Sequence, residues 1–227
     1  MIEAIVALTL GLFVVHMGLT AVVELRRAGV RLAARQDALL SLRIARHVLR
    51  RELGHSDAVR DWSVGGDSLS LRAFRGMGLL CEEPSSSTGW VVAYRGERAP
   101  DPAKDSLEVT YSDGSVRYAD LIGVGAAAEA CGTPDATEVT FVWRTEPPLG
   151  DGAVLARIFE RGSYHVSGSA LRYRRGGGGR QPLTPELWSD EASGWRLGGG
   201  RVALELVPRS PEAGRPWSGF IAWLVNP

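Results

Sequence analysis

The sequence predicts an α+β protein in which one long N-terminal helix packs on an antiparallel β-sheet body. Three observations lead to this fold class. Residues 4–23 contain no Asp, Glu, Lys or Arg, helical periodicity continues beyond them, and alternating β-rich runs follow from about residue 60. The 227 residues therefore divide into a long helix at 1–60 and a β-rich globular body at 61–227.

The uncharged segment at residues 4–23 is long enough to span a bilayer. Its 20 residues, at about 1.5 Å each, extend roughly 30 Å, which is the thickness of the hydrocarbon core. A cleaved signal peptide is the alternative, but it would have a basic flank, a shorter apolar core and a small-residue cleavage site. We therefore expect a single-pass anchor that contacts membrane lipid through residues 4–23.

The second half of the predicted helix carries an apolar stripe. One heptad phase contains Leu25, Leu32, Leu39 and Leu53, and the complementary phase contains Leu42 and Leu49. No proline precedes Pro84, and Gly54 is the expected C-terminal cap. We expect the stripe to dock the body that follows. A coiled-coil dimer is the alternative, although arginines interrupt the heptads.

The body contains seven β-rich runs separated by turn residues. They lie at residues 67–76, 89–96, 105–121, 136–146, 153–179, 201–209 and 219–227. "SDG" at 112–114 predicts a hairpin, and "ERGS" (160–163) and "VSGSA" (166–170) predict further tight turns. "PSSSTG" (84–89) and "RRGGGGRQP" (174–182) are typical of exposed loops.

Composition and motifs argue against several classes of function. The 26 basic and 26 acidic residues balance, whereas nucleic-acid binders usually have a basic excess. The four histidines are scattered, two cysteines without companion ligands do not form a zinc site, and no G-x-S-x-G motif is present. We therefore expect no enzymatic activity, no metal, no cofactor and no nucleic-acid partner.

The two cysteines, Cys81 and Cys131, allow two interpretations. They are either buried thiols in a reducing compartment or one disulfide in an oxidising one. The membrane segment favours the disulfide, because a body exported across a membrane meets oxidising conditions.

Tryptophans gather near the C-terminus, where Trp188 and Trp195 again allow two interpretations. Core packing of a C-terminal sheet is the first. The second is an exposed aromatic patch that contacts another subunit.

The stretch "IEAIVALTLG" resembles the prepilin-type methylation segment, in which a Phe-Thr-Leu-Ile-Glu-like sequence precedes an apolar helix. Together with the long helix and the β-rich body, it makes the chain similar to type IV pilins and pseudopilins. Glu3 matches the conserved glutamate of that family. The body size and the stretch "YHVSGSALRYRRG" look most like W-type minor pilins and the J-type pseudopilins of type II secretion.

The resemblance implies a pilin-like fold and a role in filament assembly. Such proteins are first anchored in the bacterial inner membrane with the body in the periplasm. They then join a filament by packing their apolar helices together. Within the filament, the glutamate offsets the N-terminal amine of a neighbouring subunit, which would be the role of Glu3. The alternative is that Glu3 simply lies at the headgroup level, where the helix macrodipole favours an acid.

The N-terminus departs from the family pattern. The basic leader and the glycine before the cleavage site are absent, and Met1 stands where the family usually has leucine. The only nearby basic flank follows the apolar segment, which by itself predicts a cytoplasmic body. An upstream start with a basic leader would correct both departures, and it would make a prepilin peptidase a further partner. The alternative is a degenerate member of the family that is never processed, and we favour the upstream start.

The sequence thus leads to two hypotheses. The first is a non-enzymatic minor pilin or pseudopilin that acts with sibling subunits and the inner-membrane assembly platform. Its large body favours a position that starts or caps a pilus or pseudopilus, at the filament tip. The second is a single-pass, membrane-anchored extracytoplasmic domain that binds or transforms a ligand and has no relation to filaments.

Overall fold

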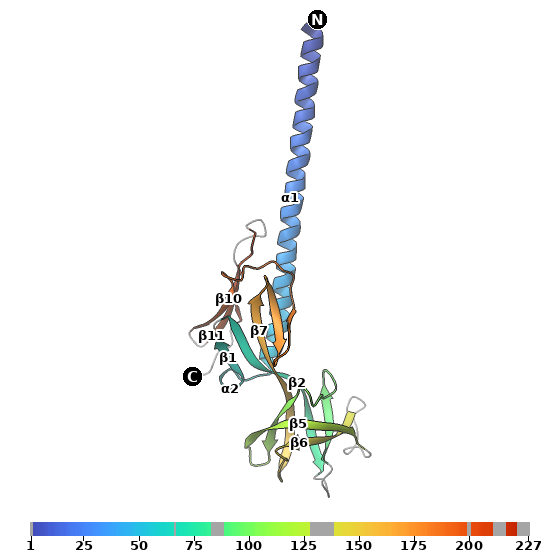
Figure 1. Ribbon diagram of the computed structural model, residues 1–227, viewed down its shortest axis with the longest axis vertical. Coiled ribbons are helices and arrows are strands. Elements are labelled where there is room, and N and C mark those ends of the chain that lie inside the picture. The colour runs from blue at the N-terminus through green and yellow to red at the C-terminus, as the bar shows by residue number, and fades with distance from the viewer. Residues whose placement is uncertain are drawn as a thin grey trace.

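A computed structural model describes residues 2–65, 67–82, 89–127, 139–198, 201–210 and 217–221. A single long helix, α1 (Ile2–Gly54), projects from a β-rich body, and the short helix α2 (Ala58–Asp61) follows it. The body lies around the C-terminal part of α1 and continues beyond its end (Figure 1). The predicted α+β class is therefore confirmed, and the helix ends at the expected Gly54.

One part of the body is a sheet that covers the C-terminal part of α1, and we call it the helix-docked sheet. Its strands are β1 (Trp62–Gly65), the first half of β2 (Ser68–Glu82), the second half of β7 (Ala153–Ser167), β8 (Ala170–Arg175) and β9 (Arg180–Pro182). All neighbouring strands are antiparallel. The turn between β7 and β8 contains Gly168 and Ser169, both with positive φ, so "VSGSA" forms the predicted hairpin.

The other part is a closed six-stranded barrel beyond the end of α1. The remaining halves of β2 and β7 join β3 (Trp90–Gly96), β6 (Val139–Glu146), β5 (Val116–Ala126) and β4 (Ser106–Tyr111) in that order, and the pairing of β2 with β7 closes the ring. The turn from β4 to β5 is the predicted hairpin at residues 112–114, with Gly114 at φ 81°. The single sheet expected from the sequence is therefore replaced by two connected parts.

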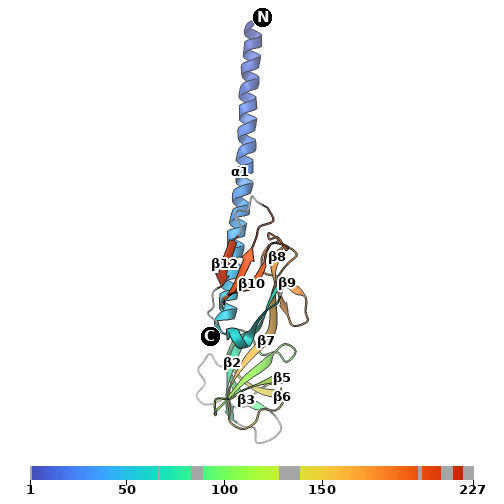
Figure 2. The same cartoon turned by 90° about the vertical axis from the view of Figure 1, so that its left-hand side faces the viewer.

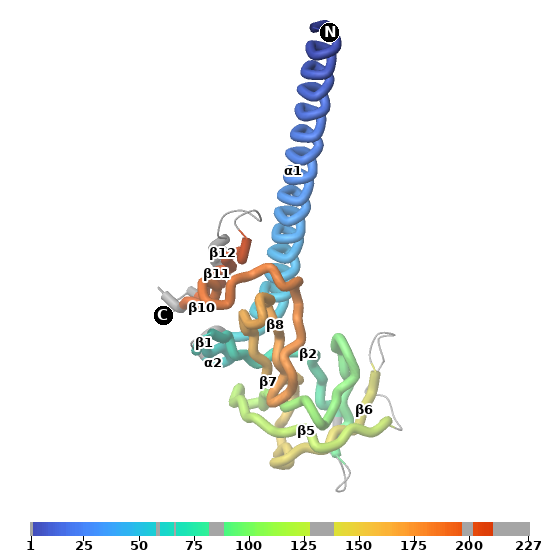
Figure 3. The backbone as a smooth tube through the Cα atoms, turned by 45° about the horizontal axis from the view of Figure 1, so that its top comes forward, coloured from blue at the N-terminus to red at the C-terminus, as the bar shows by residue number. Residues whose placement is uncertain are grey.

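A separate three-stranded sheet near the C-terminus completes the fold. It consists of β10 (Gly194–Gly198), β11 (Arg201–Leu206) and β12 (Trp217–Ile221). Figure 2 shows β10 and β12 beside α1, and Figure 3 shows them well apart from the barrel strands β5 and β6. Buried side chains of β10 and β11 join the core that the helix-docked sheet forms with α1.

Two hydrophobic cores correspond to these parts. The first contains the docked face of α1, the inner face of the helix-docked sheet and side chains of β10 and β11. The second fills the barrel, with Trp143 fully buried among Val92, Tyr94, Leu121 and Ile158. Because the barrel interior is filled by side chains, it is a packed core and has no channel.

A β-bulge at Arg75 connects the two parts of β2. Phe74 pairs with Phe159 and Gly76 pairs with Ile158, so Arg75 is the extra residue. Before the bulge Leu69 and Leu71 point into the first core, whereas Met77 lies on the outside of the barrel. The bulge changes which alternate positions face inward, and it lets one strand serve both cores.

β7 passes through both parts without such a change. The "ERGS" stretch at 160–163, predicted as a turn, lies within this strand, because Glu160 and Ser163 pair with Ala73 and Ser70 of β2. Of the predicted loop at 84–89, residues 84–88 lie outside the described part of the chain.

Candidate functional site

The N-terminal half of α1 is uncovered. Every residue from Ile2 to Ala33 is exposed, and the segment is long and apolar enough to cross a membrane. Leu8, Leu12 and Phe13 expose 74%, 71% and 60% of their surface, far more than water-facing leucine and phenylalanine tolerate in such number. This surface needs lipid or other helices around it.

Glu3 lies in the first turn of α1. At that position the unpaired backbone N–H groups and the macrodipole favour a carboxylate, which is the local explanation of this residue. The assembly role of Glu3 stays a prediction.

A stretch of α1 between the membrane segment and the body also carries apolar side chains, and we call residues 24–37 the spacer. Leu25 and Leu32 expose 77% and 59% of their surface, and Leu39, one heptad further on, exposes 49%. These three leucines form the row predicted from the sequence, but the body does not cover them. The predicted docking of this heptad phase is therefore wrong except at Leu53.

The body docks on a neighbouring face of the helix. Its buried residues are Ala38, Ser41, Leu42, Ala45, Leu49 and Leu53. The alanines let the sheet backbone approach the helix closely, and Leu49 and Leu53 are at most 1% exposed. The complementary phase, Leu42 and Leu49, therefore docks as predicted.

Trp188 and Trp195 lie in this same core. Their exposed fractions are 0% and 5%, and Trp188 Nε1 donates a hydrogen bond to Thr184 Oγ1 at 3.3 Å. Trp188 is held by an isolated bridge to Pro208 as well. The burial supports the core-packing interpretation and leaves neither indole exposed to a partner.

A buried charge network lies where the helix, the sheet and the barrel meet. Arg75, the bulged residue, donates to Glu52 Oε1 of α1 at 2.6 Å and to Glu160 Oε1 of β7 at 2.8 and 3.0 Å. Arg98 joins Glu160 to Asp105, with its shorter contact to Asp105 at 2.5 Å. The network therefore links the end of α1 to both parts of the body.

The protein environment shifts the pKa values of the two glutamates in this network in opposite directions. Burial raises the pKa of Glu52, and the nearby Arg75 only partly offsets that effect. Burial also acts on Glu160, but hydrogen bonds from Arg75 and Tyr173 outweigh it and lower the pKa of Glu160. Glu160, which accepts four hydrogen bonds from two arginines and a tyrosine, is the anionic centre of the network.

A second cluster fixes the orientation of the barrel from the other side. Glu108 of β4 accepts from Arg157 Nη1 at 3.0 Å, and Arg157 also donates to the backbone carbonyl of His55 just after α1. The Arg157 guanidinium lies 3.5 Å from the centroid of the Phe74 ring. None of these contacts could be predicted from the sequence, because each joins residues far apart in the chain.

Only one of the two cysteines of the predicted disulfide lies among the described residues. Cys81 lies at the end of β2, whereas Cys131 lies outside the described residues. The pairing of Cys81 with Cys131 therefore stays a prediction.

Among the described residues, no group of three or more His, Cys, Asp or Glu side chains is arranged to hold a metal ion.

Comparisons with known proteins do not identify a family for this chain. No family model, no curated protein and no solved structure matches the chain.

Proposed function

We propose that the protein is a membrane-anchored assembly subunit of the minor pilin or pseudopilin kind. The single observation that carries the proposal is the division of α1 into an uncovered half and a docked half. The uncovered half extends from Ile2 to Ala33, and all of its side chains are exposed with respect to the described part of the body.

The spacer supports assembly over simple anchoring. A helix that only tethers a domain needs apolar side chains within the bilayer, about 20 residues long. Here Leu25 and Leu32 lie beyond Val23 and are more than half exposed. Leucines repeated at heptad spacing suit contacts with neighbouring helices outside the hydrocarbon region.

The motif around Glu3 and the position of that residue in the first turn of α1 support the same reading. A carboxylate near hydrocarbon costs several kcal/mol unless it is paired, and an ammonium of a neighbouring subunit would remove most of this cost. The closed barrel is not specific to pilin-like proteins. In this proposal it is the distal part of the subunit, beyond the helix bundle, at the tip of a pilus or type II pseudopilus.

A filament or secretion assay with Glu3 variants tests the proposal. Glu3→Ala and Glu3→Leu should insert into the membrane normally and lose most assembly and most co-purification of sibling subunits. Glu186→Gln is the control, because Glu186 is an exposed acid of the body, 3.2 Å from Arg172, and lies outside both the membrane segment and the spacer. Normal assembly by both Glu3 variants would contradict the proposal and favour an anchored binding or enzymatic domain.

A further inference from the structure

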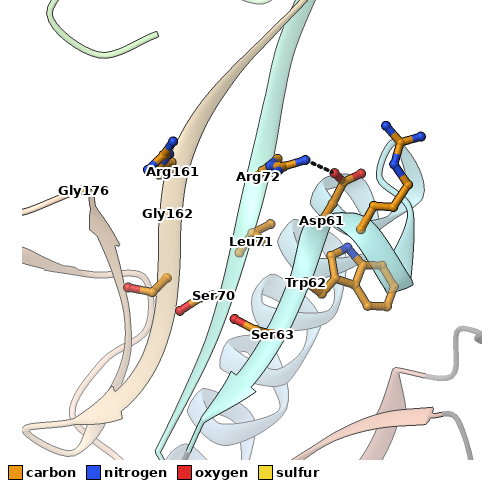
Figure 4. Close-up of a pocket in the computed structure, with 11 residues that line it drawn as sticks. Asp61, Trp62, Ser63, Ser70, Leu71, Arg72, Arg161, Gly162 and Gly176 are labelled. Carbon is orange, nitrogen blue, oxygen red and sulfur yellow. Dashed lines mark hydrogen bonds and ion pairs between the residues drawn. The ribbon is translucent and has the colours of Figure 1, made fainter. Parts of the chain in front are cut away.

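The outer face of the helix-docked sheet, on the side away from α1, is hollowed into a pocket of about 360 Å³. Figure 4 shows that β1, β2 and β7 form its floor, with Asp61 at one side and Gly176 at the other. The lining includes three arginines, Arg60, Arg72 and Arg161, and one acid, Asp61. We call this hollow the outer pocket.

Hydroxyl groups cross the floor of the outer pocket in one row. Ser63 pairs with Ser70, and Ser70 pairs with Ser163, on three neighbouring strands. Since adjacent strands lie about 4.8 Å apart, the row extends about 10 Å. Among the described residues, the hydroxyls of Ser63 and Ser70 have no hydrogen-bond partner, and Ser163 Oγ lies 2.8 Å from His165 Nε2.

Two arginines lie opposite each other beside this row. Arg72 of β2 is the direct cross-strand partner of Arg161 of β7, an arrangement in which like charges destabilise a sheet. Asp61 accepts from Arg72 at 3.2 Å and offsets part of that charge, and Arg72 also donates to the Tyr118 hydroxyl at 2.6 Å. The exposed Arg161 guanidinium has no hydrogen bond or ion pair with any described residue.

The surroundings are basic as well. His165, two residues after Ser163, is 6% exposed, and its Nδ1 has no hydrogen-bond partner among the described atoms. Burial lowers the pKa of His165, and the charges of Arg180 and Arg174 lower it further, whereas Asp67 opposes them. In the pocket lining itself three arginines outnumber one acid, and Glu108 lies 3.6 Å from Arg60.

We propose that the outer pocket binds a tetrahedral oxyanion, a phosphate or sulfate group, held by Arg161 and Arg72 and by the hydroxyls of Ser70 and Ser163. Guanidinium groups match the oxygens of such anions in geometry and charge, and serine hydroxyls donate to the remaining oxygens.

The anchoring membrane does not supply this anion. From Val23 to Gly54, α1 rises 31 residues, which at about 1.5 Å each is roughly 46 Å. The outer pocket lies at the far end of that distance, next to α2 and the start of β1. Its ligand is therefore a free ion or an anionic group on a molecule outside the membrane surface.

Thermal unfolding of the full chain in non-ionic detergent micelles tests the site. Inorganic phosphate or sulfate should raise the Tm in a saturable way, whereas chloride at the same ionic strength should not. Arg161→Gln should weaken phosphate binding at least tenfold, and Ser70→Ala should weaken it several-fold. Arg95→Gln, which removes an exposed arginine on the outside of the barrel, is the matched control and should bind as the wild type does.

Arg161→Gln has a second readout that separates binding from folding. Without phosphate its Tm should equal or exceed that of the wild type, because the variant lacks the repulsion from Arg72. An equal response to chloride and phosphate, or unchanged binding by Arg161→Gln, would overturn the proposal. So would loss of phosphate binding in proteoliposomes of anionic lipid relative to neutral lipid, since the pocket would then belong to headgroups.

Discussion

The helix-docked sheet and the barrel are built from the same two strands, yet they are stabilised in different ways. The sheet buries one face, against α1, and leaves the other face open to solvent and to the outer pocket. The barrel strands surround their own hydrophobic core, and no residue of α1 belongs to that core among the described residues. The difference shows that the sheet depends on the anchor helix for its core, whereas the barrel depends on the closure between β2 and β7.

Glycines reveal the same contrast. A Cβ at Gly78 would lie 2.3 Å from Val92 Cγ1 and 2.8 Å from the Trp143 ring. The interior of the closed barrel therefore has room for the tryptophan only because β2 has no side chain there. The helix-docked sheet fills the equivalent inward positions of β2 with Leu69, Leu71 and Ala73.

Removing the largest side chain of the barrel should have the largest effect. Trp143→Ala leaves a cavity in a closed core, so the free energy of unfolding should fall by about 4 kcal/mol. Because β2 and β7 run through both parts, denaturant unfolding in detergent should remain a single transition at a lower midpoint. Two separated transitions would show that the barrel unfolds independently of the sheet.

Breaking the network between the two parts should have the next largest effect. Glu160→Gln leaves the largely buried Arg75 and the half-buried Arg98 with fewer acidic partners, which should cost about 3 kcal/mol. Because the pKa of Glu160 is lowered in the folded state, its contribution is present above the ordinary glutamate pKa and is lost as the pH falls below it.

The pH dependence of stability in the Glu160→Gln variant should therefore be flatter on the acid side than that of the wild type. Chemical denaturation between pH 3 and 7 measures this difference. Glu186→Gln is the control, because that acid is 68% exposed and pairs with Arg172 at 3.2 Å on the surface. A parallel acid limb in wild type and Glu160→Gln would mean that this group does not link the two parts.

The smallest effect on folding is expected on the uncovered helix. Leu32→Ala should change the free energy of unfolding by less than about 0.5 kcal/mol, because the described part of the body leaves 59% of Leu32 exposed. Leu49→Ala, on the docked face, should cost about 3 kcal/mol. A filament or secretion assay should show a different effect from the stability measurement. Leu32→Ala should reduce assembly although the variant folds normally. Full assembly by Leu32→Ala would remove the spacer from the interface.

Much of the local structure follows from the sequence, because local signals determine it. The uncharged run, the cap at Gly54 and the turn residues at 112–114 and 166–170 each predict their element directly. The closed barrel could not be predicted from the sequence, since closure depends on which distant strands pair. A signal was nevertheless present at Arg75, where the alternation of β2 changes phase, and "RGMG" supplies the two small residues that closure requires.

The candidate sites also differ in how far the sequence predicts them. Glu3 stands out because a charge beside an apolar run is visible in the sequence. The outer pocket could not be predicted, because Ser63, Ser70 and Ser163 come together only through strand register. Which helix phase docks could not be predicted either, since both phases carry leucines and the alanines at 38 and 45 decide the fit.

The passage of β2 and β7 through both parts has a mechanical consequence. These strands pair directly from Ser68 with His165 to Leu79 with Leu155, and they run roughly along the direction of α1 (Figure 1). We expect a pull between the membrane and the barrel to load their hydrogen bonds in shear, many at once, and not to open them one after another. A subunit with this layout would transmit tension along its length before it came apart.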